Sequence, residues 1–406
     1  MSFLSRRLPG GVFPRLVALF PLIFPLYLVR GVFFGVPVTL PEVFLGAMLF
    51  FFLFEHEPFR VSTWKLTPIL LFLIATFIGV MVVPELAYWA DGTEFPTQIK
   101  ALGILKGWIL APLVYFVIAR NVLREKPSLI PLALKSMFVG GTVLAILALQ
   151  QVLTGEFITP DGRASGPFES ANYLSLYLGP LFVYGFFAFF ETKGRKEKFA
   201  LVLGTSLIGL ALFFSFSYAA WLALAATLAF GILIQVRRRE PRLFKWAFGG
   251  LFLMGLLLVA SQVGTEKFQQ FFEFSSQSST SVRVQVYTIA FSLIQDHPLF
   301  GIGLGQFEQQ YQAVAVQVLG VQPFEAVMLH PHNLYLSLWL STGLLGLVAF
   351  VWLCIKALPW LFEEDSKHRP IAALMLVVIL LHGLFDTPYF KNDLAFQFWL
   401  LMAVLI

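Results

Sequence analysis

The stretch from His330 to Tyr335, His-Pro-His-Asn-Leu-Tyr, is the part of the sequence best suited to chemistry. It places two imidazoles and a carboxamide just before a long apolar run, in a chain with only six histidines. An imidazole exchanges protons near neutral pH, and ionisable groups inside or beside membrane spans usually serve a function. We therefore predict that His332 is a general base acting on a hydroxyl group. Asn333 would orient it or bind substrate, and His330 is the weaker candidate. The simpler interpretation of His332 is a boundary residue that hydrogen-bonds a carbonyl.

No metal site is expected at these histidines. Neither a carboxylate nor a third histidine lies nearby at the spacing that zinc ligands show in sequence. The single cysteine, Cys354, lies in an apolar run. This position excludes a disulfide framework and a thiolate metal site. The sequence therefore implies neither a metal nor a cofactor.

Three basic residues elsewhere could bind an anion near His332. A guanidinium presents a fork that matches phosphate oxygens, so Arg163 and Arg283 would suit a diphosphate group. The alternatives are a solvated loop charge for Arg163 and interfacial snorkelling for Arg283. Lys106 lies within an apolar run, where an ammonium is costly unless it faces a polar cavity. We predict that Lys106 has a role inside the helical bundle.

Two further segments carry polar groups between apolar runs. Asp386 and Lys391 share one short loop, and the simplest expectation is a local ion pair between them. Asp386 is nevertheless retained as a candidate substrate-binding residue. The segment 215–218, Ser-Phe-Ser-Tyr, separates two short apolar runs and is typical of a hairpin between spans. Tyr218 within it is a further candidate for substrate binding.

The composition indicates an integral membrane protein. Of the 406 residues, 58% are hydrophobic and only 13% are charged, and the mean hydropathy is +0.81. Apolar runs of about 20 residues recur along the chain, each long enough to cross a hydrocarbon core about 30 Å thick. The net charge of +5 does not indicate nucleic-acid binding, because the basic residues lie in short loops. We predict an all-α polytopic membrane bundle that forms one domain, 1–406.

About twelve transmembrane helices are predicted, near 14–30, 37–54, 66–83, 98–119, 130–152, 171–190, 199–214, 217–235, 244–262, 333–356, 370–385 and 393–406. With a cytoplasmic N-terminus, alternate loops such as 193–198 and 237–245 hold most of the Lys and Arg residues. The opposite loops are nearly free of them, and the loop 84–97 is acidic. The positive-inside rule favours this orientation, with both termini in the cytoplasm.

The largest loop on the other side of the membrane, 263–332, is expected to contain helical structure. Within it, five apolar residues share one helical face and predict an amphipathic helix at the membrane surface: Val282, Val286, Ile289, Ala290 and Leu293. The following Gly-Ile-Gly-Leu-Gly, 301–305, has glycine spacing that superficially suggests a phosphate loop. No strand precedes it, so we interpret it as a tight turn.

An ordered set of motifs in the second half of the chain carries a resemblance to a known family. The motifs are Arg163-Ala-Ser-Gly166-Pro-Phe168, Asn172-Tyr-Leu, Ser281-Val-Arg283, Asp296-His297-Pro298-Leu-Phe-Gly301-Ile-Gly303, and His332-Asn333-Leu-Tyr335 with Gly343 following. Together they resemble the O-antigen ligase and polymerase superfamily, which are bacterial polytopic membrane glycosyltransferases. The similarity covers roughly 160–406 in motifs.

The resemblance implies a metal-independent, inverting transfer at the extracytoplasmic face of the inner membrane. The expected donor is a glycan on undecaprenyl diphosphate, and the acceptor is a sugar hydroxyl on a lipid or another glycan. It also implies that His332 is the base or acceptor-positioning group, that Arg283 contacts the diphosphate, and that Arg163 matches an upstream motif. One departure is Tyr218, which stands where the family usually has Arg in a Ser-Arg-x-x-Trp pattern.

Two other classes of protein are possible from the sequence. A polysaccharide or lipid transporter would need charged residues along the membrane midplane, broken helices and repeat symmetry, and only Lys106 and Lys100 hint at this. A purely structural membrane protein would leave the Arg and His residues on one side unexplained. The sequence does not decide between ligase and polymerase.

Overall fold

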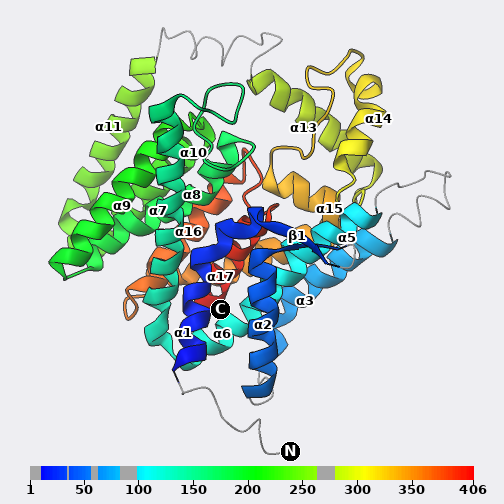
Figure 1. The fold of residues 1–406 in the computed structure, drawn as a ribbon. Helices are drawn as coiled ribbons and strands as arrows, with labels where there is room; N and C mark the ends of the chain where they lie inside the picture. The colour runs from blue at the N-terminus through cyan, green and yellow to red at the C-terminus, as the bar shows by residue number, and fades with distance from the viewer. Residues whose placement is uncertain (1–10, 34–35, 56–62, 83–97, 263–278) are drawn as a thin grey trace, which may run out of the picture.

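The computed structural model describes residues 11–33, 36–55, 63–82, 98–262 and 279–406. Across these residues the protein is a bundle of helices and nearly all-α (Figure 1). The acidic loop 84–97 and the first part of the long loop, 263–278, lie outside the described residues.

The first half of the bundle is built from apolar helices that change their winding along their length. α1 tightens into the 3₁₀ segment η1, while α3 and α5 each continue into one π-helical turn. The bounds are α1 Val12–Leu19, η1 Phe20–Leu28, α2 Leu40–Glu55, α3 Thr63–Phe77, η2 Ile78–Val82, α5 Gln98–Ile104, η3 Leu105–Leu110, α6 Ala111–Glu125, η4 Pro127–Leu129 and α7 Ile130–Thr154.

The second half continues the bundle and adds two helices at one end of it (Figure 1). The bounds are α8 Ala171–Glu191, α9 Arg195–Phe214, α10 Tyr218–Arg239, η5 Pro241–Leu243, α11 Phe244–Gln262, α13 Ser279–Asp296, α14 Phe307–Leu319, α15 Leu334–Ala357, η6 Leu358–Phe362, α16 His368–His382 and α17 Asn392–Leu405. The 13 residues of α14 were not predicted from the sequence as a helix.

One short hairpin departs from the all-α expectation. β1 (Arg30–Phe33) pairs antiparallel with β2 (Val36–Thr39), with Arg30 opposite Thr39. These are the only strands in the part of the chain that the structure describes. The hairpin joins η1 to α2, where the sequence suggested only a loop between two spans.

Each of the twelve predicted spans coincides with an apolar helix, but a count of twelve complete crossings is not established. Among the described residues, six helices are long and apolar enough to cross a membrane: Lys100–Glu125, Pro127–Thr154, Ala171–Glu191, Arg195–Phe214, Tyr218–Arg239 and Leu334–Phe362. Five further apolar helices are shorter, such as His368–His382 and Asn392–Leu405. The chain is therefore a multi-pass membrane protein by the length and composition of its helices.

Loops that the sequence assigned to the same side of the membrane meet in the structure. On one side, Arg239 at the end of α10 pairs with Glu191 at the end of α8 at 2.5 Å. On the other, Asn333 at the start of α15 donates to the Leu384 carbonyl at 2.9 Å. These contacts show that the loops in each pair lie at the same end of the bundle, and which end faces the cytoplasm stays a prediction.

The core of the bundle surrounds the C-terminal helix α17, which lies near its centre (Figure 1). Trp399 is fully buried and stacks edge-on against Phe116 of α6, with ring centroids 5.1 Å apart. Its indole donates to the hydroxyl of Tyr389 at 3.1 Å. This contact anchors the loop before α17, the same loop that carries Asp386 and Lys391, to the bundle core.

The predicted amphipathic helix exists as α13, and its apolar face is buried. Val286, Ile289 and Ala290 have no exposed surface and pack in a cluster with residues of α14 and the first turns of α15. Because that cluster includes Leu336 and Leu340 of α15, the outer helices are fixed to the helix that follows His332.

The glycine turn 301–305 docks against a break in α15. Gly343 has φ +69°, outside the helical region, so Leu344 donates its N–H to the Leu299 carbonyl instead of to Leu340. The freed carbonyl of Leu340 accepts from Ile302 at 2.8 Å and Gly303 at 3.1 Å. A Cβ on Gly343 would lie 2.3 Å from the Leu299 oxygen. The predicted tight turn is confirmed, with positive φ at Gly301, Gly303 and Gly305.

Candidate functional site

His332 lies at the mouth of α15 in an unusual backbone conformation. Its φ is +47°, in the left-handed region that side chains other than glycine seldom adopt. Asn333 follows as the N-cap: its Oδ1 accepts from Tyr335 at 2.9 Å and Leu336 at 3.0 Å. Non-glycine residues held at positive φ concentrate at functional sites. The cap therefore fixes His332 in a conformation that the chain would not adopt by itself.

Asp386 is the direct partner of His332. Nδ1 of the imidazole lies 3.4 Å from Oδ1 of the carboxylate, and Asp386 is only 2% exposed. Burial alone would raise the pKa of Asp386. The hydrogen bond from His332 and the neighbouring imidazoles outweigh burial and hold that pKa well below its usual value. The expected local ion pair was wrong, because Asp386 pairs with His332 and not with Lys391.

His330 lies beside His332, with ring centroids 4.6 Å apart. Its Nε2 is 3.3 Å from the hydroxyl of Tyr173, near the start of α8, while its Nδ1 is buried without a partner. Burial is the main cause that lowers the pKa of His330 to about 4, and the charge of His332 adds to it. His330 is therefore a neutral imidazole at neutral pH, which can relay a hydrogen bond but does not carry charge.

The absence of a nearby carboxylate, which was the reason to expect no metal site from the sequence, does not hold in the structure. Ligand atoms of His330, His332 and Asp386 all lie within 4.8 Å of one another, because the fold brings in a carboxylate that is distant in sequence. Such a donor set suits zinc. However, the nearby ammonium of Lys391 lowers the pKa of His330, and a positive charge at that distance also opposes a dication. The contact between His332 and Asp386 is accounted for by a hydrogen bond.

α13 approaches the site through Tyr287 and Arg283. The Tyr287 hydroxyl donates to the carbonyls of His332 at 3.1 Å and Leu384 at 3.2 Å. Arg283 lies one turn earlier on the same face, and its charge partly offsets the effect of burial, which raises the pKa of Tyr287. The Nε of Arg283 is buried and has no hydrogen-bond partner among the residues that the structure describes. This guanidinium thus keeps a donor available near the backbone of His332.

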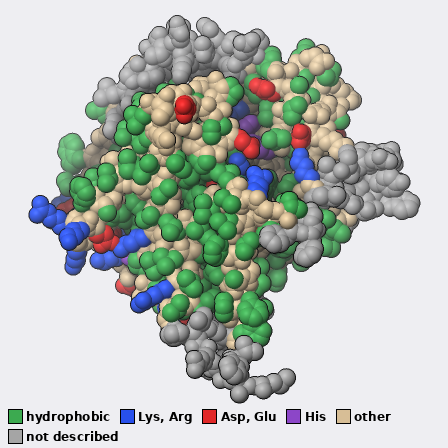
Figure 2. Space-filling view, viewed as in Figure 1, with side chains coloured by type: hydrophobic (Ala, Val, Ile, Leu, Met, Phe, Trp, Pro, Cys, Tyr) green, Lys and Arg blue, Asp and Glu red, His purple; other side chains and the backbone are tan. Residues whose placement is uncertain are grey.

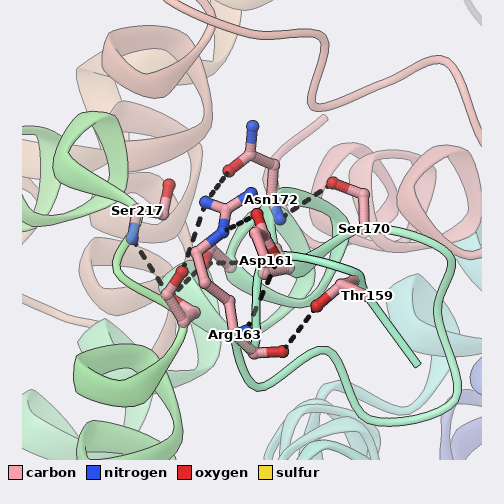
Figure 3. Close-up of polar contacts among 9 residues, drawn as sticks. Thr159, Asp161, Arg163, Ser170, Asn172 and Ser217 are labelled. Atoms are coloured by element: carbon pink, nitrogen blue, oxygen red, sulfur yellow. Dashed lines mark hydrogen bonds and ion pairs between the residues drawn. The ribbon is translucent and has the colours of Figure 1, made fainter. Parts of the chain in front are cut away.

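Unlike Arg283, Arg163 has its guanidinium in contact with several groups of the protein (Figure 3). Its Nε pairs with Asp161 at 2.6 Å, and its NH1 reaches Oδ1 of Asn172 at 3.3 Å and the Ser215 carbonyl at 3.4 Å. Burial would raise the pKa of Asp161, but hydrogen bonds from Thr159 and Arg163 lower it. Arg163 therefore ties the 159–163 loop to α8 and to the turn between α9 and α10.

Lys106 also has protein partners. It lies in the π-helical turn η3 and pairs with Glu42 of α2 at 3.0 Å, and it donates to the carbonyl of Pro37. Glu42 in turn accepts from the backbone N–H of Thr39 at 2.8 Å. These contacts fasten the β-hairpin to the bundle and account for a cation at this depth.

Tyr218 begins α10 directly after a strained turn. Phe216 has φ +48°, the other non-glycine residue in the described chain with positive φ besides His332. The Tyr218 ring packs edge-on against Trp221 at 5.2 Å and remains 52% exposed. Ser215 in the same turn is hydrogen-bonded to Ser175 at 2.8 Å, which holds the turn against α8.

The structure therefore gathers His332, His330, Asp386 and Asn333 into one cluster that Arg283 approaches through Tyr287. Lys106 and Arg163 are each paired elsewhere. A space-filling view shows histidine side chains in a recess bordered by basic and acidic groups (Figure 2). Tyr173, Tyr287 and Lys391 belong to these surroundings but were not selected from the sequence. In the sequence, the only indication of their role was that each lies within five residues of a selected residue: Asn172, Arg283 or Asp386.

Comparison with known families gives one match, which covers part of the chain. Residues 203–351 match the family model described as O-antigen ligase. The matched region runs from α9 to α15 and so contains Tyr218, Arg283 and His332, whereas Asp386 and Arg163 lie outside it. No curated protein matches the chain. The chain is a multi-pass membrane protein whose region 203–351 is similar to the O-antigen ligase family, in agreement with the resemblance that its motifs carry.

Proposed function

We propose that the protein transfers a glycan from undecaprenyl diphosphate to a sugar hydroxyl of a lipid or glycan acceptor. The family match supports a ligase-like or polymerase-like membrane glycosyltransferase with lipid-linked glycan substrates. The reaction would take place at the extracytoplasmic face of the inner membrane, with both termini in the cytoplasm. It would invert the anomeric centre and need neither a metal nor a cofactor.

The observation that carries this proposal is the pair formed by His332 and Asp386. A buried carboxylate that accepts a hydrogen bond from Nδ1–H leaves Nε2 of the imidazole as the basic nitrogen. The pair lies where α15 begins, and the side chain of His332 is 26% exposed, so an acceptor hydroxyl can approach it from outside the bundle. This geometry supports general-base catalysis by His332, with Asp386 as the orienting group.

The transfer is a single displacement. Nε2 of His332 takes the proton from the acceptor hydroxyl while that oxygen forms a bond to the anomeric carbon. The bond between this carbon and the diphosphate oxygen breaks, and its electron pair stays with the departing undecaprenyl diphosphate. One displacement at one carbon inverts its configuration. The carboxylate of Asp386 stabilises the imidazolium that forms, without itself taking up the proton.

The departing diphosphate needs positive charge. Arg283 supplies it in this proposal, because its buried Nε has no hydrogen-bond partner among the described residues and guanidinium groups bind phosphate oxygens as charge-assisted donors. Arg163 acts indirectly, because it holds the start of α8 and the turn before Tyr218 in place. Lys106 positions the β-hairpin through Glu42. Since Lys106 is paired in this way, it offers no support for a transport path through the bundle.

The test uses the full-length protein in lipid nanodiscs, a glycan on undecaprenyl diphosphate, and a candidate acceptor. We expect glycan transfer with stoichiometric release of undecaprenyl diphosphate that depends on the acceptor. His332→Ala should abolish both. The matched control is His297→Ala, because His297 is exposed and lies outside the cluster. Loss of transfer in the control alone, or full transfer by His332→Ala, would rule out His332 as the base.

A further inference from the structure

Lys391 is a partly buried cation that is not paired with a carboxylate in the part of the chain that the structure describes. Its ammonium lies 3.3 Å from the ring centroid of Tyr173, 5.6 Å from that of Phe168 and 5.9 Å from that of Tyr27. These rings come from α8, the loop before it and η1. Within the described residues, Lys391 forms no ion pair. Three aromatic rings thus surround a charge that no carboxylate contacts directly.

This environment leaves the ammonium incompletely stabilised. Burial is the main cause that lowers the pKa of Lys391, and the charges of Asp393 and Glu169 raise it only in part. Arg30, an exposed residue on β1, is close enough to lower it further. Ring faces attract a cation, but they replace the lost hydration and hydrogen bonds incompletely. A cation in such a place is well suited to receive an anionic ligand.

Most other basic side chains around this end of the bundle are neutralised by the protein itself. Lys100 pairs with Glu308, Lys106 with Glu42 and Arg163 with Asp161. Among the described residues Arg30, Arg283 and Lys391 form no ion pair with a carboxylate, but Arg30 is exposed, whereas Arg283 and Lys391 are partly buried. The two lie on different elements, the first on α13 and the second at the start of α17.

Lys391 is also connected to His332, through contacts with Tyr173 and His330. The Tyr173 ring that Lys391 covers carries the hydroxyl that contacts Nε2 of His330 at 3.3 Å, and His330 packs against His332. The charge of Lys391 reaches His330 strongly enough to lower its pKa. An anion bound at Lys391 would therefore lie next to the histidine cluster.

We propose that Lys391 binds the diphosphate of the lipid-linked donor, together with Arg283, and stabilises it as the leaving group. The inference rests on the proposed function. The donor diphosphate is a diester, whereas the released undecaprenyl diphosphate is a monoester that gains further negative charge, since the second phosphate pKa is about 6. A second cation beside Arg283 therefore stabilises the product more than the donor, and so favours breakage of the bond from the anomeric carbon to the diphosphate oxygen.

A structural role for Lys391 is the competing explanation. The side chain could simply fasten the loop 385–391 to Tyr173 and its neighbouring rings. Lys391→Met separates the two roles, because its unbranched stem fills the same space between the rings without a charge. Lys391→Arg keeps the charge. Lys100→Met is the matched control, since Lys100 lies at the same end and is already paired with Glu308.

The experiment measures donor KM and kcat, and also thermal stabilisation by inorganic pyrophosphate, for the full-length protein in nanodiscs. We expect Lys391→Met to raise the donor KM at least tenfold and to lose pyrophosphate stabilisation, with a melting temperature close to that of the wild type. Lys391→Arg should keep most of both properties, and Lys100→Met should resemble the wild type. A wild-type KM in Lys391→Met, or equal losses in Lys391→Met and Lys391→Arg that follow the melting temperature, would overturn the inference.

The pyrophosphate measurement separates this inference from the proposed function. If the wild type transfers no glycan but pyrophosphate stabilises it and not Lys391→Met, the anion site stands and the transferase proposal fails. If the wild type transfers glycan and Lys391→Met behaves in the same way, the transferase stands and the role of Lys391 is refuted.

Discussion

The surroundings of Arg163 and of Arg283 show two ways in which a membrane protein can use an arginine. Arg163 has an acidic partner, a side-chain amide and a backbone carbonyl, and all three belong to the protein. Arg283 has a buried Nε that contacts no acceptor. Both residues fit family motifs and both looked equally suited to a diphosphate in the sequence. The difference lies in how much of each guanidinium the fold has already used.

The two polar residues before α15, His332 and Asn333, also differ in how many of their hydrogen-bonding groups the protein already uses. Asn333 accepts from two N–H groups and donates to one carbonyl, so its side chain serves the helix end. His332 uses Nδ1 for Asp386 and has no other side-chain hydrogen bond in the described structure. A residue with unused donors or acceptors beside a recess is a candidate for contact with substrate. A residue whose groups are all used is a candidate for positioning.

The largest effect is expected at His332. His332→Gln keeps a hydrogen-bonding side chain but cannot take a proton, so general-base catalysis predicts a rate loss of about 10²- to 10⁴-fold. The measurement is the single-turnover rate of glycan transfer at saturating donor. Appreciable activity in His332→Gln would instead make His332 an acceptor-positioning residue.

The next effect tests the unused guanidinium. Arg283→Ala should raise the donor KM by about 10- to 100-fold, because hydrogen bonds to charged groups contribute about 1.5–3 kcal/mol. The melting temperature should change little, because the Nε has no hydrogen bond to lose within the part of the chain that the structure describes. An unchanged donor KM would remove Arg283 from the diphosphate site.

Arg163→Ala should show the opposite pattern. Loss of its contacts should lower the free energy of unfolding by about 1 kcal/mol, a small value because solvent at the exposed Asp161 screens the ion pair. Donor KM per folded molecule should stay close to the wild-type value. A specific rise in donor KM without loss of stability would show that Arg163 contacts the donor after all.

A smaller effect concerns pH and His330. Its pKa is about 4 in the folded protein, below the usual 6.5, so between these values the unfolded chain binds more protons than the folded one. Stability should therefore fall as the pH drops from 6.5 to 4. In His330→Asn this fall should be smaller, as measured by melting temperature across the range. An identical pH profile in the two proteins would contradict the assignment.

The smallest effect is expected from metal removal. Chelation with EDTA should leave transfer unchanged if the cluster of His330, His332 and Asp386 works through protons. Loss of activity on chelation and recovery with zinc would assign the cluster to a metal and replace the general-base mechanism.

Part of this arrangement could be predicted from the sequence because it depends on local periodicity. The apolar runs gave the helices, and the spacing of Val286, Ile289 and Leu293 gave the buried face of α13. The order of the motifs led to His332. α14 was missed because glutamines interrupt its apolar pattern, and the short β-hairpin has no distinctive signal.

The partners of the site residues could not be predicted in this way. His332 and Asp386 are 54 positions apart, and Tyr173 and His330 are 157 apart. Which side chains meet over such separations depends on how α8, α15 and α16 pack, and periodicity does not encode that packing. For the same reason Lys391 was assigned to Asp386, its neighbour in sequence, although its ammonium lies over Tyr173.

The break in α15 at Gly343 has a consequence for which parts of this protein tolerate substitution. The outer segment is joined to α15 by main-chain hydrogen bonds from Leu344 to the Leu299 carbonyl and from Ile302 and Gly303 to the Leu340 carbonyl. This connection depends on Gly301 and Gly343, where an added Cβ would lie 2.3 Å from a carbonyl oxygen of the other segment, and hardly at all on the side chains around it. Substitutions on the exposed surfaces of α13 and α14 should therefore leave these main-chain hydrogen bonds, and with them the position of the outer helices against α15, unchanged.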